Sequence, residues 1–339
     1  MRPTQYIPMR TTEIPALPFD PSSPTRHGSG LVRPECVLAN RTGHLFASDF
    51  RGGVSHLTPD GACRLYLGSS ADLPETLKPN GIALESDGSF LIAHLGDDSG
   101  GVFRLTRAGQ LTPLLLELDG VPLPPTNFVT RDTAGTLWAT ISTRIRPRAL
   151  DYSPDASTGF IVADPGDGPR IVADGLGFTN EALVHPSGTH LYVVETYARR
   201  LTRFPILGPA RLGPRETVAT FGPGQFPDGF AFDSEGNVWI AVIISNQLIH
   251  VDVRTGKATV ALEDSDADHT ARVEAAFQAR KLDRALLGTP ARTTLRNISS
   301  IAFGGSDLKT AYLGCLLGDT IISVPVPVAG YPPVHWTYD

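Results

Sequence analysis

The sequence is poor in cysteine and has no excess of positive charge. Only three of its 339 residues are cysteines, Cys36, Cys63 and Cys315, and they lie far apart with no CxxC pair. An odd number of separated cysteines argues against a disulfide framework or a thiolate zinc site and favours a reducing compartment. The 29 Lys and Arg against 35 Asp and Glu give a net charge of −6, which argues against nucleic acid as a partner.

Long apolar runs are also absent. No stretch approaches the roughly 18 apolar residues of a membrane span. The beginning of the sequence, MRPTQYIPMRTTEIPALPFD, contains Arg and Pro but no continuous apolar segment of signal-peptide length. We therefore expect a cytoplasmic protein without a membrane partner.

Turn-forming residues are abundant and dispersed: the chain has 34 Gly and 29 Pro. This distribution is typical of many short strands joined by turns. One unit recurs six times, namely a polar residue, a short apolar alternation, a turn that mostly ends in Gly, and an apolar run; each copy predicts a β-hairpin. The copies read PECVLANRTGHLFASDF, NGIALESDGSFLIAHLG, TNFVTRDTAGTLWATIS, TNEALVHPSGTHLYVVET, PDGFAFDSEGNVWIAVI and SSIAFGGSDLKTAYLGC.

Further strand-like segments follow the hairpins, such as VSHLTPDG and CRLYL after the first copy. The first five copies begin 46 to 53 residues apart. Four strands at this spacing are typical of a propeller blade, in which each sheet buries its faces against its neighbours. The sequence therefore predicts an all-β fold, a six-bladed β-propeller of four-stranded blades that occupies residues 31–339 as a single domain.

Two segments depart from the repeat. Between the fifth and sixth copies, residues 263–290 are rich in Ala, Arg, Glu and Leu with apolar residues at helical spacing. This pattern predicts a helical insertion from Ala267 to Leu287 on one face of the propeller, as either a packing element or a lid. Residues 1–30 are expected to form an N-terminal arm that packs on the outside or helps to complete the last blade.

The first position of every copy carries an oxygen-bearing side chain. The innermost strand of each propeller blade starts at one face of the central channel, so these side chains should converge near the axis. An isolated Asn or Asp before a strand usually caps a turn, but two carboxylates and three amides at corresponding positions indicate a shared site. The residues are Glu35, Asn80, Asn127, Asn180, Asp228 and Ser299.

Converging carboxylate and amide oxygens suit a hard divalent cation. In the absence of Cys and His, this set favours Ca²⁺ or Mg²⁺ over Zn²⁺. Glu35 and Asp228 would supply the charge, and Asn180 would supply a neutral oxygen. An open coordination position could then hold water or a substrate oxygen, as in metal-dependent hydrolases.

The copies that begin at Thr126, Thr179 and Pro227, together with NISSIAFGGSDLKTAYLG from Asn297, resemble the SMP-30/gluconolactonase/LRE family of regucalcin-like proteins. The resemblance covers roughly residues 30–335, and its most specific pieces are GLGFTNEALVHPSGTHLYVVET, FPDGFAFDSEGNVWIA and SSIAFGG. It implies a six-bladed propeller with one divalent metal at the channel mouth and, in many members, hydrolysis of lactones.

The resemblance also implies roles for particular residues. Glu35, Asn180 and Asp228 would be the metal ligands, and Asn127 would contact the substrate or metal-bound water. Asp228 would act as the general base, unless metal-bound hydroxide takes that role. One divalent metal is expected as the cofactor, Ca²⁺ first and Mg²⁺, Mn²⁺ or Zn²⁺ as alternatives, and the expected partner is a small-molecule lactone.

The sequence departs from the sugar-lactonase members at one position. Those members often carry an Arg two residues before the channel Asn, whereas Pro125 stands there in this chain. The departure argues against sugar-lactone specificity and points to a less polar lactone or an ester. Arg144 is a candidate for the missing cation, and with Asn80 and Asn127 it completes the predicted substrate-binding set; an arginine that is solvated or ion-paired between blades is the alternative.

Other polar residues near the copies are expected to lie outside the site. Glu181, next to Asn180, is expected to point away from the metal and to bond within its blade. Glu195, Thr196 and Tyr197 are expected to face inter-blade grooves or the opposite end of the channel.

The main hypothesis is a metal-dependent lactonase, a carboxylic ester hydrolase in which the cation polarises the carbonyl while water attacks. Two alternatives stay open. One is a non-catalytic propeller that binds calcium or another metal, and the other is an esterase of the same fold that acts on aryl or phosphate esters.

Overall fold

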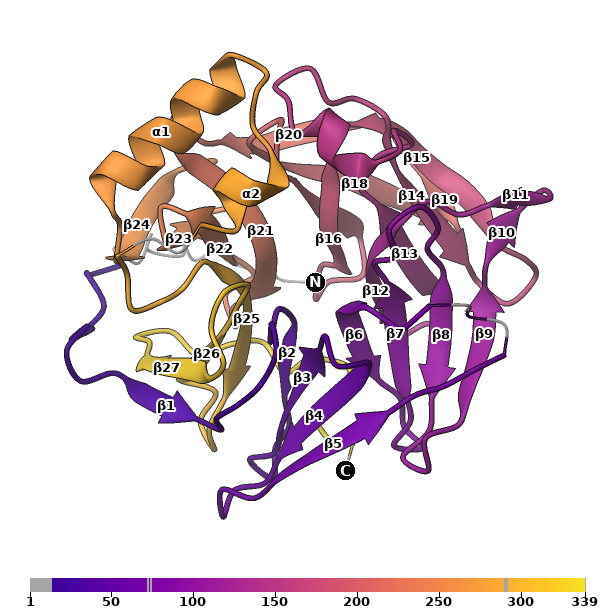
Figure 1. Ribbon diagram of the computed structural model, residues 1–339, viewed down its shortest axis with the longest axis horizontal. Helices are drawn as coiled ribbons and strands as arrows, with labels where there is room; N and C mark the ends of the chain where they lie inside the picture. Colours follow the sequence, from indigo (N-terminus) through magenta and orange to yellow (C-terminus); the bar gives the residue numbers. More distant parts are fainter. Residues whose placement is uncertain (1–13, 72, 74, 290–291, 339) are drawn as a thin grey trace, which may run out of the picture.

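Each repeat of the sequence folds as an antiparallel sheet whose first strand is the innermost. The computed structural model describes residues 14–71, 73, 75–289 and 292–338. Within these residues, six sheets of four or five strands radiate around a central axis, and a two-stranded ribbon lies outside them (Figure 1). The turn glycines act as predicted: Gly88 and Gly236 close their hairpins at φ values of 80° and 81°, which a side chain would disfavour. The predicted six-bladed propeller is confirmed.

The strands of the first three blades are short, and the two inner strands of each blade are almost entirely buried. Blade one contains β2 (Val37–Ala39), β3 (Leu45–Asp49), β4 (Gly53–Leu57) and β5 (Cys63–Leu67). Blade two contains β6 (Pro79–Leu84), β7 (Phe90–His94), β8 (Val102–Leu105) and β9 (Leu111–Leu115). The ribbon β10 (Glu117–Leu118) and β11 (Val121–Pro122) leads to blade three, which contains β12 (Thr126–Arg131), β13 (Leu137–Ile141), β14 (Gly159–Asp164) and β15 (Arg170–Leu176).

The last three blades follow the same order from the axis outward. Blade four contains β16 (Thr179–Val184), β17 (His190–Glu195), β18 (Arg200–Gly208), β19 (Arg211–Leu212) and β20 (Glu216–Thr220). Blade five contains β21 (Gln225–Phe232), β22 (Val238–Ile244), β23 (Gln247–Val251) and β24 (Ala258–Glu263). Blade six contains β25 (Ile298–Gly304), β26 (Thr310–Cys315) and β27 (Ile321–Pro325).

The sixth blade takes its outer strand from the other end of the chain. Strand β1 (Thr25–His27) pairs antiparallel with β27, with Thr25 opposite Ser323. A side-chain hydrogen bond between His27 Nε2 and Ser323 Oγ, 2.9 Å long, adds to this pairing. The arm thus joins the first and last parts of the sequence, so that the ring of blades is closed by main-chain hydrogen bonds. Residues 1–13 of the predicted arm lie outside the described residues.

The core lies between neighbouring blades rather than inside any one of them. Phe46 of blade one packs against Phe90 of blade two, with ring centroids 5.6 Å apart, and both side chains are fully buried. Phe103 of β8 belongs to the same cluster. Burying one such side chain contributes on the order of 2–3 kcal/mol, so a single blade would lose most of its core if it stood alone.

The predicted helical insertion is confirmed as two helices between β24 and β25, α1 (Ala267–Gln278) and α2 (Arg284–Leu287) (Figure 1). Asp266 caps α1 by accepting a hydrogen bond from the backbone N of His269 at 3.1 Å. Phe277 on the buried face of α1 packs edge-on against Phe226 of β21 at 5.1 Å. Neither helix in the described part of the chain has the length and apolar character needed to cross a membrane.

Candidate functional site

The starts of the innermost strands surround a cavity of about 290 Å³, hereafter the site cavity. Five of the six residues at the first position of the repeat line it, and all five are buried. The sixth, Ser299, stays outside the lining and donates from Oγ to the backbone O of Glu35 at 2.9 Å. The five are Glu35, Asn80, Asn127, Asn180 and Asp228.

A break in strand pairing places most of these side chains. Between β16 and β17 the register shifts between Thr179 and Ala182, and between β21 and β22 it shifts between Pro227 and Phe230. The same irregularity occurs at the start of β6, β12 and β25. An irregularity of this kind bends the strand and re-aims a side chain. Asn80, Asn127, Asn180 and Asp228 all lie inside such breaks, which explains how consecutive blades direct polar groups toward the axis.

Glu35, Asn180 and Asp228 form the polar centre of the site cavity, with residue exposures of 7%, 6% and 5%. Nδ2 of Asn180 donates to Oδ1 of Asp228 and to Thr196 Oγ1, the latter at 3.0 Å. Burial and then the Glu35 carboxylate raise the pKa of Asp228 well above its ordinary value. Two carboxylates that repel each other in a buried site favour either a proton or a cation between them.

Two buried oxygens at this end of the channel lack a hydrogen-bond donor among the described residues. They are Glu35 Oε2 and Asn127 Oδ1. Arg33 Nη2 lies 2.8 Å from Glu35 Oε2, so that oxygen has an ion-pair partner, but the contact does not have hydrogen-bond geometry. Buried oxygens are normally satisfied, and an oxygen-seeking cation would satisfy both. The residues therefore fit a divalent cation.

The amide oxygens are needed for such a site. Among the described residues, no three His, Cys, Asp or Glu side chains cluster closely enough to hold a metal. The two carboxylates Glu35 and Asp228 would have to be supplemented by amide oxygens such as that of Asn180. Mixed carboxylate and amide oxygen sets are typical of Ca²⁺ and Mg²⁺ sites.

Asn80 and Asn127 are tied to each other beside this centre. Nδ2 of Asn80 donates to the backbone O of Asn127 at 2.9 Å, and Arg33 Nη1 donates to Asn80 Oδ1 at 3.3 Å. Arg33 thus contacts both Glu35 and Asn80. Sequence reasoning missed Arg33, although it stands directly before the Pro34-Glu35 pair that opens the first repeat.

The structure does not bring Arg144 to the site cavity. Its guanidinium forms a bidentate pair with Asp174 at 2.7 and 2.9 Å and stacks 4.1 Å from the Phe160 ring centre. This is the ion-paired alternative. Arg148 lines the cavity instead, from the 3₁₀ helix Arg148–Asp151 that follows β13. The two arginines are four residues apart in RIRPR. The conformation of this loop decides that Arg148 lines the site cavity and Arg144 does not.

The segment after β17 corrects another expectation. Thr196 and Tyr197 line the site cavity rather than an inter-blade groove, and Thr196 holds the Asn180 amide. Glu195 does face its own blade, where it accepts from Arg200 at 2.6 and 2.7 Å. Glu181 points away from the site cavity as expected, but it accepts from Phe230 N of the next blade at 3.1 Å.

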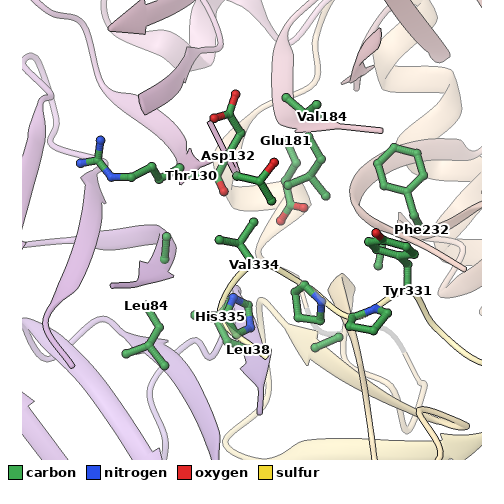
Figure 2. Close-up of a pocket in the computed structure, with 18 of the residues that line it drawn as sticks. Leu38, Leu84, Thr130, Asp132, Glu181, Val184, Phe232, Tyr331, Val334 and His335 are labelled. Carbon is green, nitrogen blue, oxygen red and sulfur yellow. The ribbon is translucent and has the colours of Figure 1, made fainter. Parts of the chain in front are cut away.

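A second cavity, of about 580 Å³, lies where the innermost strands end, hereafter the tail cavity. Figure 2 shows Tyr331, Val334 and His335 of the C-terminal segment lying across it, with Glu181 at its wall. The segment is held by its backbone: Tyr331 N donates to Phe232 O at 2.9 Å. Burial raises the pKa of Glu181 well above its ordinary value, with smaller contributions from Asp228 and Glu35.

Comparison with known families agrees with this geometry. The model of the family described as SMP-30/gluconolactonase/LRE-like region matches residues 33–274. The chain belongs to the SMP-30/gluconolactonase/LRE-like family. The match includes Glu35, Asn127, Asn180 and Asp228, and part of α1.

Members and relatives of the SMP-30/gluconolactonase/LRE-like family differ in what their names describe. A 6-deoxy-6-sulfogluconolactonase from Pseudomonas putida is 27% identical over 286 residues, which are 82% of this chain and 81% of that protein. Strictosidine synthase-like protein 4 from Arabidopsis thaliana is 29% identical over 174 residues, 49% of this chain, and the match spans 44% of its length.

Solved structures share the fold across almost the whole chain. A gluconolactonase from Xanthomonas campestris superposes with a TM-score of 0.64 at 19% identity, covering 94% of this chain and 96% of that one. A calcium-binding regucalcin from Agrobacterium tumefaciens gives 0.63 at 20% identity, with 94% and 97% covered. Together they show that this chain shares the fold of these proteins.

Proposed function

We propose that the protein is a divalent-metal-dependent hydrolase that opens a lactone ring. The observation that carries the proposal is the convergence of Glu35, Asn180 and Asp228 with Asn127, where two buried oxygens have no hydrogen-bond donor. Membership of a family that includes gluconolactonases, and the resemblance to a 6-deoxy-6-sulfogluconolactonase, support lactones as the substrate class.

Glu35, Asn180 and Asp228 would hold the cation, which when bound supplies a Lewis acid to polarise the lactone carbonyl. Asn180 donates to Oδ1 of Asp228, so Oδ2 is the oxygen assigned to accept the proton of the attacking water. The water oxygen bonds to the carbonyl carbon, the ring C–O bond breaks, and the ring oxygen takes a proton to give a hydroxy acid.

Asn127 and the walls of the cavity orient the substrate in this proposal. The backbone of Asn127 is held by Asn80, whose Nδ2 donates to the Asn127 carbonyl O at 2.9 Å. Phe178 and Tyr152 pack edge-on with ring centres 5.5 Å apart and line the cavity. Leu287 of α2 also lines it, so the insertion shields the reacting groups from bulk water.

A non-catalytic calcium-binding propeller is the second candidate. It is favoured by the likeness to a regucalcin described as a calcium-binding protein, and it would need the same three ligands. In that case the cation would stabilise the protein without turnover.

A lactone and ester panel measured with and without chelator separates the candidates. We expect ring opening of at least one lactone to vanish with chelator and to return with added Ca²⁺, Mg²⁺, Mn²⁺ or Zn²⁺. A metal-dependent rise in melting temperature with no turnover of any substrate would favour the binding protein. Turnover of aryl or phosphate esters alone would favour the esterase, and turnover that survives chelation would contradict metal dependence.

A further inference from the structure

Arg148 is a buried guanidinium at the wall of the site cavity. Its residue exposure is 8%, and its Nε has no hydrogen-bond partner among the described residues. Nη2 donates to Ser142 Oγ at 3.2 Å, which is a neutral acceptor. Its guanidinium carbon also lies 5.0 Å from the ring centre of Phe178, another lining residue. A buried arginine normally has a carboxylate partner.

No carboxylate among the described residues forms an ion pair with Arg148. Arg33 is paired with Glu35 at 2.8 Å, and Lys78 is paired with Asp97 at 2.7 Å. Asp151 follows in the same 3₁₀ helix, but its Oδ2 is buried without a hydrogen-bond partner among the described residues. Arg148 therefore retains donors that the protein itself does not use.

The charge of the lining also favours an anion. Four cationic side chains, Arg33, Lys78, Arg148 and Arg284, and three carboxylates, Glu35, Asp97 and Asp228, line the cavity. A bound divalent cation would raise the excess of positive charge in the lining from one to three. A cavity with such an excess attracts and retains anionic ligands.

We propose that Arg148 binds an anionic group of the substrate, so that the lactone opened here carries a carboxylate, sulfonate or phosphate. This inference rests on the lactone hydrolysis proposed above. It replaces the expectation, based on Pro125, that the substrate is less polar than a sugar lactone. An arginine presents a planar fork of donors that matches each of these groups. Arg148 thereby takes the place of the cation that the sequence lacks before Asn127.

The test compares two lactones that differ in charge. D-Glucaro-1,4-lactone carries a carboxylate where D-glucono-1,4-lactone carries a hydroxymethyl group. We expect the wild type to prefer the charged lactone in kcat/KM by about tenfold or more, and Arg148→Met to remove this preference, mainly through KM. Arg148→Lys should restore part of it. Arg144→Met, four residues away and outside the cavity, should keep it.

A binding measurement separates this inference from the proposed reaction. The product D-glucarate, titrated calorimetrically into the metal-loaded protein against D-gluconate, should bind more tightly to the wild type than to Arg148→Met. Tighter binding without turnover of either lactone would support the anion site while rejecting lactone hydrolysis. Equal loss for both lactones in Arg148→Met, no charge preference in the wild type, or loss of preference in Arg144→Met would overturn the role of Arg148. Melting curves of each variant exclude misfolding as the cause.

Discussion

The two ends of the channel are built from the same strands and differ in chemistry. Where these strands start, the site cavity is lined by carboxylates, amides and cations. Where they end, the tail cavity is twice as large and is lined both by apolar side chains such as Leu38 and Phe232 and by charged ones such as Arg131 and Asp132, with the C-terminal segment across it (Figure 2).

The difference shows that the larger cavity is not the one in which the polar residues of the repeat converge. Pairing breaks near the starts of β6, β12, β16 and β21 coincide with Asn80, Asn127, Asn180 and Asp228 of the site cavity. Beyond the breaks the strands pair regularly and direct both apolar and polar residues toward the tail cavity. Glu181 is one of the charged residues at that end, and burial raises its pKa well above the ordinary value.

The largest effect is expected from Asp228→Asn. The substitution keeps the size of the side chain but removes one of the two charges that would hold the cation. We expect kcat/KM for lactone opening to fall by about 10³-fold or more. Because Asp228 and Glu35 repel each other, the metal-free variant should melt at a higher temperature than the metal-free wild type. Near-normal turnover, measured at saturating metal, would contradict the assignment.

Gly229→Ala tests the close approach of blades behind Asp228. A Cβ at Gly229 would lie 2.5 Å from Ser299 O and 2.6 Å from Glu181 Oε1, so β21 and β25 would have to separate. We expect a loss of about 1–3 kcal/mol in the free energy of unfolding, measured by urea denaturation. Gly222→Ala is the matched control, because its nearest contact is the flexible Gln225 Oε1 at 3.5 Å. Equal stability of the two variants would refute the tight contact.

His335, which lines the tail cavity, is expected to make the stability of the protein sensitive to acid. Burial lowers the pKa of His335 from 6.5 to about 4, so the unfolded chain binds a proton that the folded chain rejects between these values. Its contribution to stability is therefore fully present above pH 6.5 and is lost as the pH falls toward 4, by about 1–3 kcal/mol. His335→Gln should flatten the stability curve in this window, and an unchanged slope in urea titrations would disprove the role.

The smallest effect is expected from Glu181→Gln. The folded-state pKa of Glu181 is raised, so the folded protein binds the extra proton and the wild type loses stability as the pH rises through that pKa. Gln stays neutral, and its carbonyl can still accept from Phe230 N. We expect lactone turnover within about twofold of wild type and a stability advantage that grows with pH. A large loss of turnover would mean that the two ends of the channel act together.

Much of the fold could be predicted because each blade repeats its own turn chemistry. The D-G, S-G and E-G pairs fix hairpins locally, and six copies fix the number of blades. The helical insertion could be predicted from its 3.6-residue periodicity. In the structure the helix is interrupted only between α1 and α2. The placement of Glu35, Asn127, Asn180 and Asp228 at one cavity followed from their shared position in the repeat.

The cations of the site could not be predicted in the same way. Arg144 and Arg148 lie in one irregular loop, where no periodicity tells which side chain turns inward. Thr196 and Tyr197 reach the cavity because the chain bends directly after β17, which depends on contacts with Phe178 rather than on local sequence. Residues placed by repeats are readable from sequence, whereas residues placed by loops depend on tertiary contacts.

The most direct test of the account is the position of a bound cation. Crystals of the protein grown with Mn²⁺, measured at the manganese absorption edge, locate the ion by anomalous scattering. We predict a single strong peak in the site cavity, coordinated by oxygens of Glu35, Asn180 and Asp228, that disappears in Asp228→Asn. No peak there at saturating Mn²⁺, or a peak beside Glu181 in the tail cavity, would contradict it.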